Sequence, residues 1–399
     1  MEEKIIFIAG GPWQKPFVKY LKNKGHYIAI VNPIETETTN IANLHIKCDI
    51  NNIKFIEKFI KKIKPKFITS DQSDISTHTV SLLSTRWNLP CNSLDSIDKL
   101  TNKLSIYKFA KKNKINVPNT KLVYSTDDIK KFFINSNGPV VIKPIDSTNS
   151  RGFKKFENLS EINETIFENT KNFSKTKQVI AQNFINGSMI TLDGICSNYK
   201  HKTLVGGTKN KYFKPGINQD ITYPLDLENN FFQKITKVND LYIEKSGMQF
   251  GLTHSEYIVC NNEFYLIEIS GRGGGAGITD KIIPWVSGVD IYDVLYESIL
   301  GKDVNVKNII PKKNHALLKY YTQKDLNNFK KENEILILKI KGVADFHTNF
   351  KGKQFISDIE DCRHSLGIYL AKTDQELKKT IKKVESILFP NNKEQKNIV

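Results

Sequence analysis

The chain has 399 residues, 39% of them hydrophobic, and a formal net charge of +17. A chain of this length can bury a large core and is expected to divide into two to four domains. No apolar run reaches the roughly 18–20 residues that a membrane span needs, and the charged N-terminus leads directly into an apolar strand. We therefore expect neither membrane association nor a secretory signal peptide.

The positive charge does not indicate a nucleic-acid partner. Only four of the 59 basic residues are arginines, and the lysines are spread along the whole chain. Nucleic-acid binding would favour a clustered basic stripe with interleaved aromatic residues. The five cysteines show no CxxC or CxxH spacing, which favours reduced thiols and a cytoplasmic location.

The first part of the chain alternates short apolar strands with helical patterns. This order predicts an open parallel α/β domain over residues 1–95. The turn after the first strand reads GGPWQK, not GxGxxG, so an NAD site is disfavoured. The predicted strands are Lys4–Ala9, Tyr27–Val31, His45–Lys47 and Phe67–Ser70, and the predicted helices are Trp13–Lys24, Ile53–Ile63 and about Ser76–Trp87.

A predicted helix, Asn102–Lys114, is followed by a short apolar strand that ends at Lys143-Pro144. The next residues, 146–152, are small and polar, so their backbone N–H groups could bind an anion. Lys143, this loop and Arg151 together suggest a phosphate-binding site. The sequence is not a Walker A motif, and an ordinary surface loop is the alternative.

The remaining predicted elements frame one irregular stretch, Lys211–Pro224, which we interpret as a lid or substrate loop. The sequence after residue 310 predicts a small αβ tail. The last residues, 391–399, are expected to be disordered. The predicted helices are Leu159–Lys171, Asp226–Lys245, Gly288–Leu300 and Asp374–Leu388, and the predicted strands are Gln178–Ile185, Ser188–Cys196 and two near Ile335–Ile340 and Gly367–Leu370.

The most unusual chemistry lies in Phe250–Gly277, which reads as two strands, a tight turn and a glycine cluster. A three-residue turn, 261–263, would pair Cys260 with Phe264 and place Glu256 opposite Glu268, with Cβ atoms roughly 5 Å apart. Leu266, Glu268 and Ser270 would then share a face. A two-residue turn would put the two acids on opposite faces.

Two carboxylates held this close repel each other unless a cation lies between them. Mg²⁺ (or Mn²⁺) fits, because it binds one or two carboxylates and completes its shell with water and phosphate oxygens. The hydroxyl of Ser270 could be a third ligand. The alternative is a surface hairpin whose acids face water. Arg272 and the following glycines suit close approach by an anion, although Arg272 could instead pair with a nearby acid.

The order of these parts resembles the ATP-grasp superfamily over roughly Lys4 to Leu388. The resemblance rests on three ordered segments: TNKLSIYKF, PVVIKPIDSTNSRGF and HSEYIVCNNEFYLIEISGRGGG. It implies an ATP-grasp domain at 96–310 with antiparallel sheets and a small lid subdomain at about 120–185, then a C-terminal αβ domain at 311–390. The fold class is α/β (α+β).

The resemblance also implies residue roles. Lys103 and Lys143 would hold ATP phosphates under the loop that contains Ser147, Ser150, Arg151 and Gly152. Adenine would contact the hinge of Gln182, Phe184 and Ile185. Glu256 and Glu268 would bind Mg²⁺, and Arg272, with Lys143, would act in catalysis by stabilising the acyl phosphate.

Three positions depart from the family pattern: Gln182 and Met189 replace hinge glutamates, and Ser270 replaces the common asparagine. The implied reaction is an ATP-dependent joining of a small carboxylate to an amine or ammonia, in a homodimer. A kinase, a carbamoyl-phosphate-type enzyme and a non-catalytic nucleotide-binding regulator are alternatives. The substrates are left open, because amino acids, peptides and sugar acids all fit.

Overall fold

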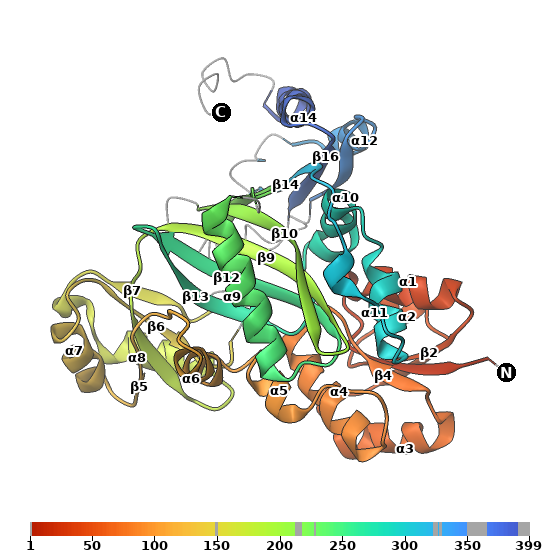
Figure 1. Ribbon diagram of the computed structural model, residues 1–399, viewed down its shortest axis with the longest axis horizontal. Coiled ribbons are helices and arrows are strands. Elements are labelled where there is room, and N and C mark those ends of the chain that lie inside the picture. Colours follow the sequence, from red (N-terminus) through yellow and green to blue (C-terminus); the bar gives the residue numbers. More distant parts are fainter. Residues whose placement is uncertain are drawn as a thin grey trace.

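The computed structural model describes residues 2–147, 151–211, 218–226, 229–321, 326, 329–348 and 365–389. Its strands form three sheets, one parallel and two with antiparallel pairing (Figure 1). This mixed architecture confirms the expected fold class. None of the helices in those ranges is long and apolar enough to cross a membrane.

The N-terminal sheet has the strand order β3-β2-β1-β4, and all of its pairs are parallel. Its strands are apolar on both faces because helices cover both sides, as the buried Ile5 and Ile6 on opposite faces show. The strands are β1 (Lys4–Ile8), β2 (Tyr27–Asn32), β3 (Leu44–Lys47) and β4 (Phe67–Thr69), and the helices are α1 (Lys15–Asn23), α2 (Glu37–Asn40), α3 (Ile53–Ile63), α4 (Asp74–Arg86) and α5 (Leu94–Asp98).

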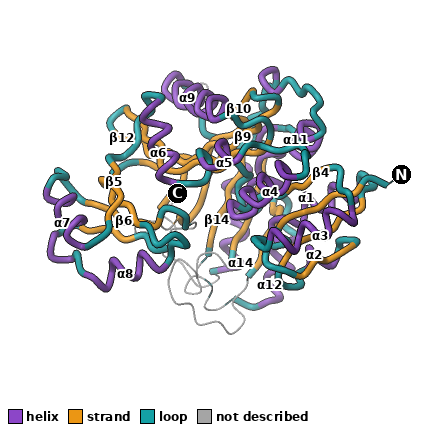
Figure 2. Tube along the Cα trace, turned by 90° about the horizontal axis from the view of Figure 1, so that it is seen from below, coloured by secondary structure: helices purple, strands orange, loops and turns teal. Residues whose placement is uncertain are grey.

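A second, four-stranded sheet has the order β5-β8-β6-β7. It projects on the side of the molecule opposite the N-terminal sheet, with α7 and α8 beside it (Figure 2). The predicted helix Leu159–Lys171 is divided here into a short 3-10 turn and α8. The strands are β5 (Thr120–Val123), β6 (Val140–Pro144), β7 (Lys154–Phe156) and β8 (Val179–Asn183), and the helices are α6 (Lys103–Lys112), α7 (Thr126–Ile134) and α8 (Glu164–Asn172).

The largest sheet has eight strands in the order β13-β12-β9-β10-β11-β14-β16-β15. Helix α9 (Asn230–Ser246) lies across one face of it (Figure 1) and buries Tyr242 and Ile243 in a cluster with Ile190 and Tyr257. Strands from residues 188–270 and 315–371 thus form one continuous sheet. They are β9 (Ser188–Ser197), β10 (Lys200–Lys211), β11 (Asn218–Tyr223), β12 (Gly251–Cys260), β13 (Glu263–Ser270), β14 (His315–Tyr320), β15 (Val343–His347) and β16 (Leu366–Ala371).

The prediction of a loop over Lys211–Pro224 is partly wrong, because this stretch contains strand β11. This strand pairs with β10 on one side and with β14 on the other, so it connects the two halves of the large sheet. Ile221 alternates with polar neighbours and is buried, a period-two signal that the turn residues Pro215-Gly216 obscured in the sequence. The rest of the predicted loop, residues 212–217, lies outside the described residues, as does the expected tail 391–399.

The strand predicted near Ile335–Ile340 is also wrong, because residues 335–338 belong to helix α12 (Lys331–Leu338) and the next two form the turn after it. A short apolar run does not distinguish a strand from a helix, and here two glutamates lie in the first turn, where they favour a helix. Ile337 is buried and its neighbours Leu336 and Leu338 are exposed. The other helices of this part are α10 (Ile283–Ser287), α11 (Ile291–Ile299) and α14 (Asp374–Leu388).

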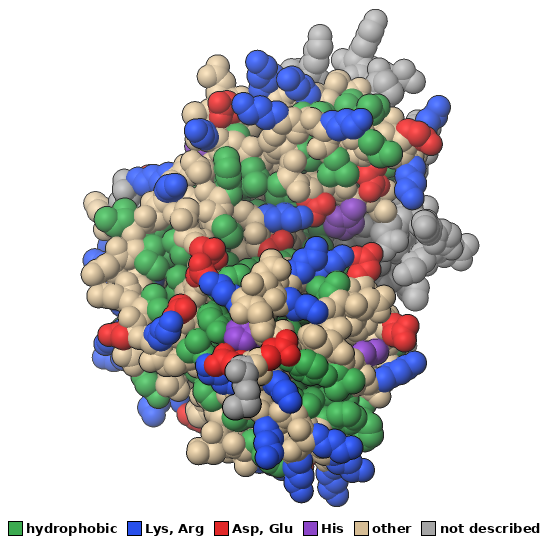
Figure 3. Space-filling model, turned by 90° about the vertical axis from the view of Figure 1, so that its right-hand side faces the viewer, with side chains coloured by type: hydrophobic (Ala, Val, Ile, Leu, Met, Phe, Trp, Pro, Cys, Tyr) green, Lys and Arg blue, Asp and Glu red, His purple; other side chains and the backbone are tan. Residues whose placement is uncertain are grey.

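The C-terminal strands contact the N-terminal part of the chain. Lys281 forms an ion pair with Asp345 of β15, and the rings of Trp13 and His347 lie 6.3 Å apart. On the side of the molecule that is at the right in Figure 1, charged side chains of both signs gather in a hollow across the middle (Figure 3). The glycine segment after β13 lies near residues from both ends of the chain, because an added Cβ at Gly275 would lie 3.9 Å from Trp13 and one at Gly277 would lie 2.3 Å from Ile368.

Candidate active site

The β12–β13 hairpin turns through two residues, not three. Asn261 and Asn262 have φ values of 51° and 60°, and Cys260 pairs with Glu263. A two-residue turn with both central residues left-handed is a favoured hairpin connection, and asparagine tolerates that conformation. The predicted pairing of Cys260 with Phe264 is therefore wrong.

A β-bulge restores the pairing of the two acids. The register shifts between Glu256 and Tyr257, so that Tyr257 pairs with Leu266 and Glu256 pairs with Glu268. Ile267 is the extra residue, and the hydroxyl of Tyr107 donates to its carbonyl at 2.7 Å. A bulge reverses the alternation of side chains. Leu266 therefore packs in the α9 cluster, on the face opposite Glu268. The expectation that Leu266 and Glu268 share a face is wrong.

Glu256 lies between two basic side chains. Lys209, on β10 beyond the intervening strand β9, forms an ion pair with it, and the Nε2 atom of His254 lies 3.5 Å from its Oε1 atom. Burial alone would raise the pKa of Glu256, but Lys209 and His254 outweigh it and hold this pKa well below its usual range. Glu256 is therefore ionised at neutral pH.

His254 in turn is held by Asp193 of β9, which is completely buried. The Nδ1 atom of His254 lies 2.7 Å from Asp193 Oδ1. Burial favours the neutral ring, but the Asp193 charge and the contact with Glu256 raise the pKa of His254 to about 9. A charged histidine thus lies beside the paired acids.

Glu268 is the more accessible acid, with 32% of its side chain exposed. The ammonium of Lys103 lies 3.5 Å from its Oε1 atom and donates to the backbone oxygen of Ser147 at 2.6 Å. The side chain of Asn102 caps helix α6, and the N–H of Lys103 bonds to Ile145 at the end of β6. The helix start thus places Lys103 between the hairpin acid and the expected phosphate loop.

Lys143 lies on strand β6 of the second sheet and contacts α6. Its ammonium donates to the Tyr107 hydroxyl at 2.8 Å. Burial lowers the pKa of Lys143 to about 8, although Glu268 and Glu256 oppose the shift. Gln182, expected at the adenine hinge, donates from its side chain to Thr120 at 2.7 Å.

The expected nucleotide loop is described only in part. Ser147 ends the described stretch before it, and Arg151 is exposed after it. Gly152 has a φ of 73°, and an added Cβ would lie 2.9 Å from Pro144, so this position requires glycine for the turn itself. Ser150, also expected to contact ATP, lies outside the described residues.

At the expected adenine hinge, the N–H of Phe184 bonds to Pro139 O at 2.9 Å. Adenine contacts by the backbone of Phe184 are therefore limited to its carbonyl. Among the hydrogen bonds of the described residues, none involves the backbone of Ile185. Ile185 is half-buried and lies two residues after the end of β8, which makes its N–H group the better candidate for an adenine contact.

Arg272 forms a two-pronged ion pair with Asp74, the first residue of α4. Its Nε atom lies 3.0 Å from Asp74 Oδ1 and its Nη2 atom 2.8 Å from Asp74 Oδ2. Burial would raise the pKa of Asp74, but Arg272, helped by the hydroxyl of Ser270, lowers it. Ser270 thus contacts Asp74, and its expected role as a third metal ligand stays a prediction.

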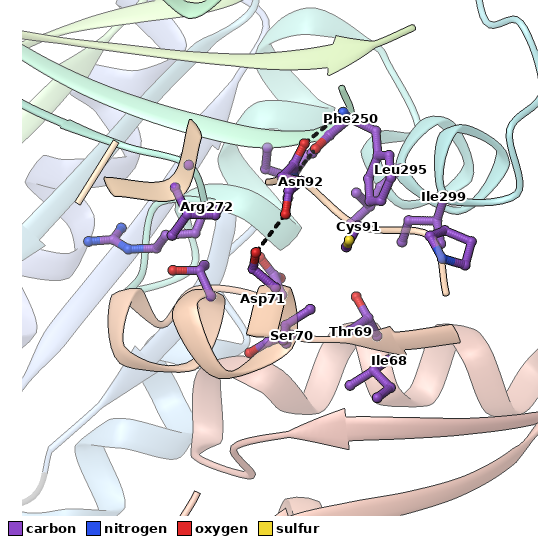
Figure 4. A pocket seen from close by; sticks show the side chains of 18 residues that line it. Ile68, Thr69, Ser70, Asp71, Cys91, Asn92, Phe250, Arg272, Leu295 and Ile299 are labelled. Carbon is purple, nitrogen blue, oxygen red and sulfur yellow. Dashed lines mark hydrogen bonds between the residues drawn. The ribbon is translucent and has the colours of Figure 1, made fainter. Parts of the chain in front are cut away.

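A cavity of about 60 Å³ lies beside this ion pair, between the end of β4 and the start of β12. Asn92 bridges its wall by donating to Phe250 O at 2.8 Å, and the guanidinium of Arg272 points away from it (Figure 4). Small-molecule sites are usually several hundred Å³. This cavity is therefore too small for a nucleotide, and the candidate site is the charged face of the large sheet.

The glycine run after Arg272 is also required for packing. An added Cβ at Gly273 would lie 2.2 Å from Thr279 Oγ1 and 3.1 Å from Asp71 Oδ1. The segment thus lies directly against the turn that follows β4. That turn is at the carboxyl end of a parallel strand, where open α/β sheets usually bind ligands.

Several residues of this site had no recognisable signal in the sequence. They come from four different segments, and only the fold brings them to the hairpin and Arg272: Lys209 contacts Glu256, Asp193 contacts His254, Tyr107 contacts Ile267 and Asp74 contacts Arg272. His254 was the exception, because it lies two residues before Glu256 and so shares its strand face.

Comparisons with known proteins agree with this architecture. Residues 100–214 match the ATP-grasp domain family. A formate-dependent phosphoribosylglycinamide formyltransferase of Sulfolobus acidocaldarius is 20% identical over 330 residues, which cover 79% of this chain and 81% of that protein.

Two solved structures share the fold along almost the whole chain. An L-amino acid ligase from Bacillus licheniformis has a TM-score of 0.79 at 14% identity, covering 96% of this chain and 97% of that one. The N5-carboxyaminoimidazole synthetase of Staphylococcus aureus, solved with ADP, has a TM-score of 0.75 at 18% identity, covering 97% and 98%. At these identities the likeness shows the fold.

Proposed function

We propose that this chain is an ATP-dependent ligase of the ATP-grasp type that joins a small carboxylate to an amine or to ammonia. The proposal rests on one observation above all. Two acids from the β12–β13 hairpin lie side by side, with His254 of the same hairpin and with Lys103 and Lys209 from other parts of the fold around them. Such a cluster can bind and neutralise phosphate groups.

The proposed reaction has two steps. A carboxylate oxygen of the substrate attacks the γ-phosphorus of ATP, the bond to the β,γ-bridging oxygen breaks, and ADP leaves. The amine nitrogen then attacks the carbonyl carbon of the acyl phosphate, inorganic phosphate leaves, and the nitrogen loses a proton. Each step moves negative charge between oxygens, so fixed positive groups are the main source of rate enhancement.

The acids fit Mg²⁺. Both are hard oxygen ligands, and Mg²⁺ binds one or two protein carboxylates when phosphate oxygens complete its shell. Across the described ranges, no larger cluster of His, Cys, Asp and Glu side chains is suited to a metal. Glu256 and Glu268 would hold the ion, which would neutralise charge on the phosphates. Lys209 would need to release Glu256, and a phosphate oxygen offers it another acceptor.

The two lysines beside the hairpin are the proposed phosphate ligands. Lys103 reaches Glu268 and the start of the phosphate loop, and Lys143 lies on the next strand against Tyr107. Because its pKa is lowered to about 8 by burial, Lys143 gains more than a solvated lysine does when a phosphate arrives. Adenine would bind at the hinge near Ile185, and Arg272 would stabilise the acyl phosphate.

Phosphate release tests this function. Purified protein with ATP and Mg²⁺ is incubated with panels of amino acids, short peptides and sugar acids, each with an amine or ammonium, and phosphate and ADP are measured. We expect ADP release that requires a carboxylate and a coupled amide product, found by mass spectrometry. ATP binding without turnover on any panel would instead favour the regulatory alternative. The expected homodimer is checked by light scattering.

A further inference from the structure

The ion pair between Asp74 and Arg272 joins two parts of the fold that are 198 residues apart in sequence. Asp74 begins α4 of the N-terminal part, and Arg272 follows strand β13, which carries Glu268. Only 17% of the arginine side chain and 13% of the aspartate side chain are exposed. A shielded two-pronged pair fixes both the position and the plane of a guanidinium.

The contacts leave part of the guanidinium available. Arginine carries five N–H groups. Asp74 accepts one from Nε and one from Nη2, and the carbonyl of Gly273 accepts one from Nη1 at 2.9 Å. Within the described residues, one N–H on each terminal nitrogen therefore remains, enough for a further bidentate anion. Asp74 thus binds one edge of the guanidinium and uses only two of its N–H groups.

We propose that Asp74 is the positioning residue of the reaction: it orients Arg272 so that the remaining N–H pair faces the anionic group of the substrate. This inference rests on the proposed ligase function and adds a residue to it. The pair also makes the arginine position depend on how the N-terminal sheet sits against the hairpin.

A double-mutant cycle tests the positioning role. Asp74→Asn keeps the shape but offers one acceptor and one amide, which cannot match two N–H donors. We expect kcat to fall on the order of 10–100-fold with unchanged ATP affinity, the scale of a slightly misplaced group. In the Arg272→Lys background, which has no fork to orient, the same change should cost less than about threefold. Equal losses in both backgrounds would overturn the proposal.

A matched control separates positioning from stability. Lys319 and Glu385 form another partly buried ion pair, at 2.9 Å, in the C-terminal part. Lys319→Met should change the unfolding midpoint and leave kcat unchanged. If Lys319→Met reduced kcat as much as Asp74→Asn does, loss of an ion pair anywhere would explain both effects, and the positioning role would be wrong.

A spectroscopic arm does not depend on turnover. The chain has only four arginines, so Nε-labelled arginine gives at most four Nε–H signals by NMR. The Arg272 signal, identified by its loss in Arg272→Lys, should be protected from solvent exchange in the wild type and lose protection in Asp74→Asn. Inorganic phosphate added with ADP and Mg²⁺ should shift it in the wild type only.

The two arms separate the two hypotheses. If no carboxylate supports turnover but phosphate shifts the Arg272 signal in an Asp74-dependent way, the ligase function fails and the positioning of an anion-binding arginine holds. If turnover occurs while phosphate leaves the signal unchanged, the ligase function holds and the role of Asp74 is wrong.

Discussion

Two acidic regions of the molecule differ in how their charges are balanced. In the β12–β13 hairpin, Glu256 contacts Lys209 and His254, and Glu268 lies near Lys103. In the turn after β4, Asp74 has Arg272, whereas the contacts of Asp71 are with the neutral side chains of Gln72 and Tyr292, at 2.9 and 3.4 Å.

The difference shows what keeps a buried carboxylate charged. Cations hold the pKa of Glu256 and of Asp74 low in spite of burial, but burial raises the pKa of Asp71 to about 6. The charge of Glu256 in the hairpin is therefore maintained at neutral pH, as metal binding requires. In the β4 turn, Asp74 keeps its charge, whereas burial disfavours the charged form of Asp71.

The largest expected effect is on the hairpin. Glu268→Gln keeps the shape of the side chain but removes one of the two proposed metal-binding charges. We expect phosphate release to fall by about 1000-fold or more, because charge neutralisation of the phosphates is the main catalytic term. Phosphate release at saturating ATP, over a range of Mg²⁺ concentrations, measures the loss.

Glu263→Gln is the control for this change. Glu263 begins the same strand but is exposed, and its carboxylate accepts a hydrogen bond from the hydroxyl of Tyr265. It should retain wild-type activity. If Glu268→Gln were as active as this control, the paired acids would not form the metal site.

The next largest effect is expected for Arg272, the ion-pair partner of Asp74 in the β4 turn. Arg272→Lys keeps a positive charge near Asp74 but loses the planar fork. We expect normal folding and ATP affinity, with kcat and kcat/KM both lower by about 100-fold, as for removal of a transition-state donor. Near wild-type turnover would make Arg272 purely structural.

A smaller effect is expected at Lys143, which lies near the hairpin acids without bonding to them. Lys143→Ala removes a charged donor to phosphate, worth about 1.5–3 kcal/mol, so ATP affinity should fall roughly 10–100-fold. Isothermal titration with a non-hydrolysable ATP analogue measures it. The matched control is Lys154→Ala, an exposed lysine on the adjacent strand β7, which should bind normally. Equal affinity in both variants would contradict a phosphate contact by Lys143.

The hairpin was predictable because its signal is local. Period-two alternation located both strands to within a residue or two, and the shared strand face of Glu256 and His254 follows from their spacing. The pairing of the acids was right although the turn was wrong, because the bulge at Ile267 compensates for the shorter turn. A bulge held by Tyr107 from α6 depends on tertiary contact, which alternation does not contain.

The β4 turn was not predictable for the same reason. Residues 70–74 read as an ordinary polar turn, and nothing near them in sequence indicates that Asp74 meets Arg272. Helix α12 is a second case, since the apolar run at Ile335–Ile340 suits either structure until its packing is known. The domain division at residues 95 and 310 and the site roles stay predictions.

The last prediction compares Asp71 and Asp74 directly, by stability. The pKa of Asp71 is raised to about 6 in the folded protein, against about 3.9 for an unfolded chain. The folded state thus binds the proton more tightly, and stability that is complete below pH 4 is lost as pH rises to about 6. Relative to Asp71→Asn, the wild type should lose up to about 3 kcal/mol between pH 4 and pH 7.

Asp74 should behave in the opposite sense. Its folded pKa is lowered, so its ionised form stabilises the protein above the unfolded pKa, and this contribution is lost as pH falls. Urea unfolding of the wild type, Asp71→Asn and Asp74→Asn from pH 3 to 7.5 gives both trends as differences, the Asp74 trend below about pH 4.5 and the Asp71 trend above it. With rising pH, Asp71→Asn should gain on the wild type while Asp74→Asn falls behind it. Parallel curves for the two variants would mean that Arg272 does not distinguish these two carboxylates, and the comparison between the paired and the unpaired acid would fail.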